Sequence, residues 1–280
     1  MKISIVIPVY NEERVIAKCL EAISLLGVKP YEVVLVDNNS TDQTVAIAKK
    51  YKFVTVITEK KQGLIAARNA GFAVATGDIL ARIDADTHVS PNWTYQIEES
   101  FQDNKTAQAI TGTGYFYDAP APKTYRAIRN FVAVRLNSLL LGHDMLWGSN
   151  MAIRRTAWDE IKDKTCVDKN IMEDLDIAAH LVSNYGKKSV KFIPNMQADI
   201  SFRRAASGLK SNYFYLKQWP DTLRAHGYKL YFVIWPFIFL GLPFAAIASA
   251  SVRLYDVSKK KMVFSIKKWQ EFVVFDAPNP

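Results

Sequence analysis

Between Lys2 and Ile83, short apolar runs alternate with longer segments in which apolar residues recur every three or four positions. Short runs rich in β-branched residues predict buried strands, and the periodic segments predict amphipathic helices. Because each strand is followed by a helix after a short connection, we expect a Rossmann-like α/β fold, with a mostly parallel sheet flanked by helices. The expected strands are Lys2–Ile7, Glu32–Asp37, Phe53–Thr58 and Ile79–Ile83.

The expected helices of this half cover 15–26, 40–51 and 63–75, and Ser40 is expected to cap the second of them. The second half of the chain follows a looser alternation of the same two patterns. It adds the expected strands Ala107–Thr113 and Ser189–Ile193 and the expected helices Tyr125–Leu140, Glu173–Tyr185 and Leu209–His226.

Polar residues follow three of the expected strands, at the point where each strand ends. They are Tyr10–Glu12, Asp37–Asn39 and Asp84–Asp86. Ligands of parallel α/β sheets bind in the crevice at the carboxyl ends of the strands. We therefore expect these residues to line one binding crevice.

Asp84 and Asp86 are candidate metal ligands. In extended backbone, side chains two residues apart point the same way, so the two carboxylates converge and need a compensating cation. Carboxylate oxygens suit Mg²⁺ or Mn²⁺, and a metal held by only two of them keeps room for phosphate oxygens. At this point a solvated acidic turn is the alternative interpretation.

Other polar positions also carry candidate chemistry. Asp37 ends a buried strand, where an unpaired carboxylate is costly, and it can accept from a nucleobase or a ribose. Arg68 projects from the apolar face of its helix, and it can form a surface ion pair or reach an acidic ligand. Asp174 lies in the first turn of a helix and is a candidate general base, although the helix dipole alone also favours acids there. The segment 8–13 can line a base or ribose pocket, or can simply begin a helix.

Composition narrows the class of protein. The chain has 280 residues, of which 49% are hydrophobic and 22% charged, and these values exclude a disordered tail or a collagen-like rod. Its two cysteines are too few for a disulfide framework, which indicates a reducing compartment. The four histidines show no metal-ligand spacing, and the chain has no GxGxxG, Walker or nucleophile-elbow motif.

Taken in order, these segments resemble the inverting family 2 glycosyltransferases of the GT-A fold, over about the first 200 residues. Each motif is short, and their ordered combination is what makes the resemblance specific. The motifs are Pro8-Val9-Tyr10-Asn11-Glu12, Val36-Asp37 with Ser40-Thr41-Asp42, Gly63 with Ala67-Arg68-Asn69 and Gly71, Asp84-Ala85-Asp86 with Pro91 and Trp93, Gly148-Ser149-Asn150 with Arg154-Arg155, and Glu173-Asp174.

The resemblance implies a nucleoside-diphosphate sugar as donor, UDP-linked in many members, and a divalent metal, Mn²⁺ or Mg²⁺. It implies that Asp86 ligates the metal, that Asp84 lies near both the metal and the ribose, and that Asp174 is the catalytic base. It places Gly148 and Glu173 beside the sugar and the acceptor. The residues it assigns to the nucleoside pocket are Pro8, Tyr10, Glu12, Asp37 and Arg68.

The implied reaction transfers a sugar to an acceptor hydroxyl with inversion, for the synthesis of a cell-surface glycan or glycolipid. The QxxRW pattern of processive members is absent, so we expect one sugar to be transferred per encounter. A sugar-nucleotide nucleotidyltransferase is the first alternative, but it needs a glycine-rich loop that the segment 8–13 lacks. A non-catalytic scaffold that binds nucleotide or membrane is the second, and the presence of Asp84, Asp86 and Asp174 argues against it.

Positive charge is concentrated in the C-terminal quarter. Between Arg203 and Lys268 there are 12 basic and two acidic residues, whereas the first 202 residues hold 24 basic and 23 acidic ones. The segment Leu230–Val252 has 23 residues without a charge, which is long enough to span a bilayer. It contains two prolines and a glycine, and its basic flanks favour a re-entrant hairpin or interfacial helices over a single span. A buried helix pair is the alternative.

These patterns divide the chain into a catalytic domain, 1–202, and a membrane-association region, 203–280. The expected partners are a nucleotide-sugar donor, a glycan or lipid-linked acceptor and an anionic membrane surface at the cytoplasmic face of the cell membrane. We expect no nucleic-acid partner, because the long uncharged run fits lipid better.

Overall fold

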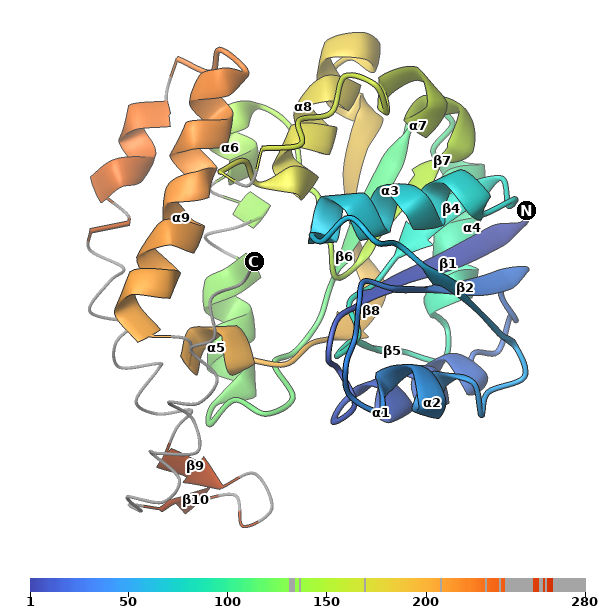
Figure 1. The fold of residues 1–280 in the computed structure, drawn as a ribbon. Coiled ribbons are helices and arrows are strands. Elements are labelled where there is room, and N and C mark those ends of the chain that lie inside the picture. The colour runs from blue at the N-terminus through green and yellow to red at the C-terminus, as the bar shows by residue number, and fades with distance from the viewer. Residues whose placement is uncertain are drawn as a thin grey trace.

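Eight strands form one sheet at the centre of the protein (Figure 1). The structure is a computed structural model, and it describes residues 1–130, 134–135, 137–168, 170–206, 208–229, 231–236, 238–239, 254–256, 259 and 261–263. The strands of the sheet are β1 (Ile3–Val9), β2 (Glu32–Asp37), β3 (Val54–Thr58), β4 (Ile79–Arg82), β5 (His88–Val89), β6 (Ala109–Thr113), β7 (Met151–Arg154) and β8 (Val190–Asp199).

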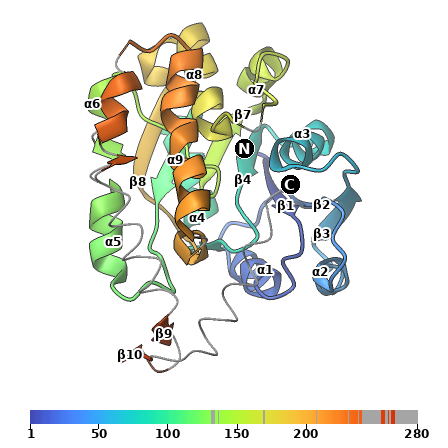
Figure 2. The ribbon, with the colours of Figure 1, turned by 60° about the vertical axis from the view of Figure 1, so that its left-hand side comes forward.

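Helices cover both faces of this sheet, and a small hairpin lies apart from it (Figure 2). The α-helices are α1 (Ile16–Ser24), α2 (Thr44–Ala48), α3 (Leu64–Val74), α4 (Trp93–Asp103), α5 (Pro122–Arg129), α6 (Asn137–Leu141), α7 (Arg155–Ile161), α8 (Glu173–Tyr185) and α9 (Gly208–Ala225). The 3-10 helices are η2 (Lys187–Ser189), η3 (Arg203–Ala206) and η4 (Tyr231–Val233), and the hairpin strands are β9 (Tyr255–Asp256) and β10 (Lys261–Met262).

The sheet is mixed, with the order β3-β2-β1-β4-β7-β6-β8-β5. Strands β1 to β4 are parallel to one another, as the sequence pattern predicts. Strand β7 runs antiparallel to both β4 and β6, and β5 runs antiparallel to β8. Strand β6 is parallel to β8, so four of the seven pairings are parallel, as predicted. The antiparallel pairings all involve β5 and β7, which are two and four residues long and were not predicted.

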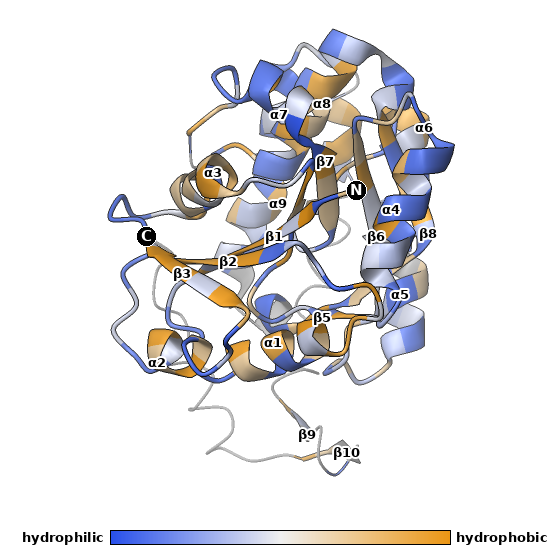
Figure 3. Ribbon diagram, turned by 90° about the vertical axis from the view of Figure 1, so that its right-hand side faces the viewer, coloured by the Kyte–Doolittle hydropathy of each residue, from blue (hydrophilic) through white to orange (hydrophobic). Residues whose placement is uncertain are grey.

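The protein has two hydrophobic core layers, one on each face of the sheet, because successive side chains of a strand point to opposite faces. In β1, Ile5 and Ile7 pack with residues of α1 and α4, and Val6 packs on the opposite face with residues of α3, α7 and α8. Figure 3 shows β1 and β2 as largely hydrophobic, and every residue of β1 is buried, as expected for a strand covered on both faces. The helices carry hydrophobic residues toward the sheet and polar ones away from it.

The expected helices were found with two corrections. Helix α2 has only five residues, and Ser40 is not its cap: Ser40 Oγ accepts from the Asn11 N–H, whereas Asp42 accepts from the Thr44 N–H at the helix start. The single helix expected over Tyr125–Leu140 is described as α5 and α6, with residues 131–133 and 136 of that prediction outside the described part. Helices α4 and α7 were not expected.

A third apolar cluster joins α9 and the residues that follow it to the rest of the protein. Trp219, Leu223, Ile234 and Ile238 pack there against Leu175 of α8. Most of the predicted membrane segment, residues 240–252, lies outside the described residues. Among the helices that the structure describes, none combines the length and apolarity needed to cross a bilayer.

Candidate functional site

The carboxyl ends of the parallel strands meet at one edge of the sheet. Val9, the last residue of β1, lies opposite Asp37, the last residue of β2, and β4 ends at Arg82, two residues before Asp84. Because β1, β2 and β4 end at the same edge of the sheet, the polar residues that follow them also lie at that edge. Tyr10 follows β1 with 42% of its surface exposed, as a residue that faces a ligand would be.

A buried carboxylate lies between two buried guanidinium groups at this edge. Glu173, the first residue of α8, accepts from Arg68 of α3 at 2.7 Å through Oε2 and from Arg82 of β4 through Oε1. Both arginines have at most 1% of their surface exposed. Arg82 also donates to Asp84 at 2.8 Å. The four side chains form one charge network that connects the strand end to the start of α8.

This network corrects one expectation and reveals one omission. Arg68 is fully buried, so it does not form the surface ion pair that the sequence left open, and its guanidinium also lies 5.2 Å from the Trp158 ring centroid. Arg82 was not selected from the sequence. The available signal was a charged residue inside the apolar run 79–83, where a guanidinium is tolerated only with a partner.

Gly148 belongs to the site because a side chain at this position would collide with Arg82. A Cβ built on Gly148 would lie 2.3 Å from Arg82 Nη1 and 2.8 Å from its Cζ, and that guanidinium is fixed by Glu173 and Asp84. The backbone N–H of Gly148 donates to Asp174 Oδ2 at 3.1 Å. Gly148 thus places the loop before β7 directly against the network and orients Asp174.

We expect Gly148→Ala to lower the free energy of unfolding by about 1–3 kcal/mol, because the added methyl displaces a buried guanidinium that has no free space. Urea unfolding of the purified protein measures this. Gly27→Ala is the matched control, since its Cβ would meet only the Pro91 carbonyl at an ordinary 3.5 Å. Equal stability of the two variants would contradict the packing described for Arg82.

Asp174 is held as a poised carboxylate in the first turn of α8. Its Oδ1 accepts from the Leu175 N–H at 2.9 Å, and its Oδ2 accepts from Gly148. Burial raises the pKa of Asp174 to about 6, and the neighbouring Glu173 carboxylate adds to the rise. Such a carboxyl is ionised at neutral pH and remains a stronger proton acceptor than an ordinary aspartate.

Asp86 and Glu12 share a cation that comes from the far end of the chain. Arg203, the first residue of η3, lies 2.9 Å from Asp86 Oδ2 and donates to both carboxylate oxygens of Glu12 at 2.7 Å. Burial raises the pKa of Asp86 to about 6, with Asp84 and Glu12 adding to the rise and Arg203 opposing it. Asp86 and Glu12 are therefore both paired with one guanidinium group. Arg203 was missed by sequence reasoning, since 191 residues separate it from Glu12.

The remaining expected residues lie in or beside the turns at the same edge of the sheet. Asp37 is 8% exposed and accepts from the Ser40 N–H at 3.0 Å, so it orders its own turn as well as the edge. Pro8 is a buried residue of β1, next to the exposed turn. Asn38 bonds the backbone of the loop after β3, and its Oδ1 accepts from the Gly63 N–H at 2.7 Å. These contacts tie the turn after β2 to the loop after β3.

The acidic residues after β4 lie in a tight turn, in which the Asp84 carbonyl accepts from the Thr87 N–H at 3.0 Å. Among the described residues, the group of three ligand atoms that all lie within 4.8 Å of one another is Asp176, His180 and His226, and not Glu12, Asp84 and Asp86. A site with two carboxylates and several phosphate or water oxygens is the usual arrangement for Mg²⁺ and similar ions. The histidine group corrects the expectation that no histidine has metal-ligand spacing, because Asp176 and His180 are four residues apart on α8.

Comparison with known proteins gives a family match over more than half of the chain. Residues 4–162 match the family model described as Glycosyl transferase family 2. "Glycosyltransferase AglE" of Haloferax volcanii is 35% identical over 119 residues, which are 40% of this chain and 36% of the relative. "Probable glycosyltransferase YdaM" of Bacillus subtilis is 29% identical over 210 residues, 69% of this chain and 49% of the relative. The chain thus spans less than half the length of these relatives.

Solved structures share the fold. A structure of the "Mannosyltransferase PcManGT" of Pyrobaculum calidifontis with GDP-Man and Mn²⁺ superimposes with a TM-score of 0.63 at 16% identity, covering 99% of this chain and 79% of that one. A structure of glucosyl-3-phosphoglycerate synthase of Mycobacterium tuberculosis with Mn²⁺, UDP-glucose and phosphoglyceric acid gives 0.58 at 19% identity, covering 81% and 80%.

Proposed function

The chain belongs to glycosyl transferase family 2, and from this premise we propose that it transfers a sugar from a nucleoside-diphosphate sugar to an acceptor hydroxyl, with inversion at the anomeric carbon. One observation carries the proposal. An acidic edge at Asp84 and Asp86 and a poised carboxylate at Asp174 are connected through the ion pairs Asp84–Arg82–Glu173, in which the Arg82 guanidinium is buried. That is the pairing of a leaving-group site and a base that such a transfer needs.

The donor is proposed to bind across the ends of β1, β2 and β4. Solved relatives of this fold hold GDP-Man, UDP-glucose or UDP-GlcNAc, which supports a nucleotide-sugar donor, and UDP is our choice of base. Pro8, Tyr10, Glu12 and Asp37 are proposed to line the nucleoside pocket. Arg68 was placed there by resemblance, and its bond to Glu173 gives it a positioning role at the same edge.

A divalent metal fits the acidic edge. Its donor set is carboxylate oxygen, which suits Mn²⁺ or Mg²⁺, and a metal on Asp86 would take the place of the Arg203 guanidinium that lies against that carboxylate. Asp86 would ligate the metal, and Asp84 would lie beside it. A bound metal would supply neutralisation of the charge that develops on the diphosphate leaving group.

The proton of the acceptor hydroxyl is proposed to go to Asp174. The N–H groups of Gly148 and Leu175 hold this carboxylate in one orientation, and Glu173 is already committed to two arginines. Glu173 is therefore proposed to border the sugar as a positioning residue. In-line attack of the hydroxyl oxygen breaks the bond to the diphosphate and inverts the anomeric carbon, with no covalent enzyme intermediate.

The acceptor is proposed to be a glycan or a lipid-linked molecule at the cytoplasmic face of the membrane. Large apolar side chains are exposed on α6, on α9 and after α9. They are Leu139, Phe214, Phe232 and Phe239, and the last three lie within the basic C-terminal quarter. Exposed aromatic rings beside lysines and arginines are typical of surfaces that bind anionic lipid. We propose that residues 203–280 bring the catalytic domain 1–202 to such a surface.

Transfer is tested with purified protein, Mn²⁺ and radiolabelled UDP- and GDP-sugars, with lipid and glycan extracts as acceptors. We expect Mn²⁺-dependent incorporation of one sugar per acceptor, with the anomeric configuration opposite to that of the donor, and its loss in Asp86→Asn. Retained configuration or long homopolymers would contradict the proposal. Release of pyrophosphate from a nucleoside triphosphate and a sugar phosphate would instead support a nucleotidyltransferase, and binding without turnover would support a scaffold.

A further inference from the structure

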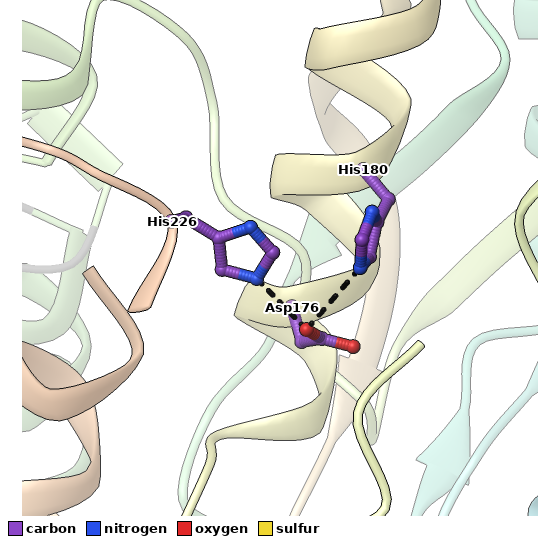
Figure 4. Close-up of side chains that lie close together, drawn as sticks. All are labelled: Asp176, His180 and His226. Carbon is purple, nitrogen blue, oxygen red and sulfur yellow. Dashed lines mark hydrogen bonds and ion pairs between the residues drawn. The ribbon is translucent and has the colours of Figure 1, made fainter. Parts of the chain in front are cut away.

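Three side chains with metal-binding atoms converge away from the acidic edge, between α8 and the end of α9 (Figure 4). Asp176 and His180 lie one turn apart on α8, and His226 follows α9. Asp176 Oδ1 lies 2.8 Å from His226 Nε2 and 3.6 Å from His180 Nε2. The two imidazole rings meet at 85° with centroids 4.9 Å apart, so they are not stacked, and both direct a nitrogen at the same carboxylate oxygen.

Asp176 Oδ1 and His226 Nε2 share a hydrogen bond, and further contacts hold the three side chains of the cluster in place. Asp176 is 2% exposed, and its Oδ2 accepts from the Cys166 N–H at 2.9 Å, which fixes the carboxylate with Oδ1 toward the histidines. His180 donates to the backbone carbonyl of Lys164. In a neutral imidazole one nitrogen carries the proton, so the His180 Nε2 that faces Asp176 at 3.6 Å then presents a lone pair to a carboxylate oxygen. A cation between these two atoms removes that repulsion, and it takes the place of the proton that His226 Nε2 shares with the same oxygen.

The donor set indicates which cation. Two imidazole nitrogens and one carboxylate oxygen suit Zn²⁺ and similar late transition ions better than Mg²⁺ or Ca²⁺, which prefer oxygen. Ligands about 2.0–2.1 Å from a tetrahedral zinc stand about 3.4 Å apart, and the two spacings to Asp176 Oδ1 lie on either side of that value. A hydrogen bond from a metal-ligating histidine to a backbone carbonyl is also the usual way its tautomer is fixed.

We propose that Asp176, His180 and His226 bind one Zn²⁺-class ion that joins α8 to the end of α9. The side chains of His180 and His226 are 21% and 18% exposed, so a water molecule can complete the coordination. The ion is separate from the metal of the acidic edge. Its place is structural, since it ties the helix that carries Glu173 and Asp174 to the C-terminal part of the chain.

The test uses the full chain, stripped with EDTA and titrated with Zn²⁺, with bound metal measured by mass spectrometry and the melting temperature by calorimetry. Co²⁺ serves as a second probe, because its visible absorption reports nitrogen ligation. We expect one Zn²⁺ per chain in the wild type and a higher melting temperature when it is bound. His226→Gln should weaken binding by more than about 100-fold, because even changes beyond the ligands cost 10–100-fold.

Two controls separate this site from the proposed catalytic metal. Asp86→Asn removes a carboxylate of the acidic edge, and His143→Gln removes an imidazole that bonds Tyr228 outside the cluster. Both should bind Zn²⁺ as the wild type does. No stoichiometric Zn²⁺ in the wild type, unchanged binding in His226→Gln, or loss of binding in Asp86→Asn would each overturn the inference. Should His226→Gln not fold, the more exposed His180→Gln decides the same question by the same criteria.

Discussion

Replacing Asp174 by Asn is expected to lower the turnover number by about 10²–10⁴-fold, the usual contribution of a general base, while donor affinity stays within a few fold. The amide oxygen can still accept from either the Leu175 or the Gly148 N–H, so the side chain keeps one of its two hydrogen bonds while it loses its basicity. Steady-state kinetics with the donor found active, together with calorimetric titration of its nucleoside diphosphate, measures both quantities.

The pH profile is the second readout of this prediction. Burial raises the pKa of Asp174 to about 6, and only the ionised form accepts a proton, so wild-type turnover should fall as the pH decreases through about 6 and stay level above it. The residual rate of Asp174→Asn should lack this inflection. Asp159 lies on α7 and forms an exposed ion pair with Lys162, and neither residue has a role in the proposed mechanism. Asp159→Asn is therefore the control and should behave as the wild type. Full activity of Asp174→Asn would remove the base from the mechanism.

Replacing Glu173 by Gln should give the largest loss of stability, about 3–5 kcal/mol in the free energy of unfolding. The carboxylate bonds Arg68 and Arg82, whose guanidinium groups are almost inaccessible to solvent, and its removal leaves two buried positive charges with too little compensation. A glutamine has one acceptor oxygen, and its amide N–H groups would face the second guanidinium. Urea unfolding monitored by tryptophan fluorescence measures the difference.

An exposed carboxylate provides the comparison. Glu98→Gln breaks an ion pair with the N-terminal amine, with both groups partly in water, and should cost at most about 1 kcal/mol. Similar losses for Glu98→Gln and Glu173→Gln would show that the buried network adds nothing to stability. A Glu173→Gln protein as stable as the wild type would mean that the arginines find other partners.

Local patterns in the sequence were sufficient to predict the strand ends. The runs before Tyr10, Asp37 and Asp84 are apolar and β-branched, the first two are followed by amphipathic segments, and alternation of that kind favours a parallel arrangement. The acidic edge follows from it, because parallel strands bring their carboxyl ends together. The long helices α8 and α9 were found within one residue of their bounds for the same reason: each has a sustained apolar stripe.

Contacts between distant segments could not be predicted. Arg82 and Glu173 are 91 residues apart, and Arg203 and Glu12 are 191 apart, so neither ion pair has a local signature. The same holds for β7, a strand of four residues whose place between β4 and β6 depends on tertiary packing rather than on its own propensity. His226 joins Asp176 only because α9 returns along α8.

The measurement that tests the central claim most directly is the melting temperature of the protein with UDP, GDP and dTDP, each with and without Mn²⁺, for the wild type and Asp86→Asn. A ligand that binds only the folded state raises the free energy of unfolding, and the increase grows with the ratio of the free ligand concentration to its Kd. A nucleotide site completed by a metal at Asp84 and Asp86 predicts that one nucleotide stabilises the wild type only when Mn²⁺ is present, and that Asp86→Asn loses the effect. No shift with any nucleotide, or an equal shift in Asp86→Asn, would contradict it.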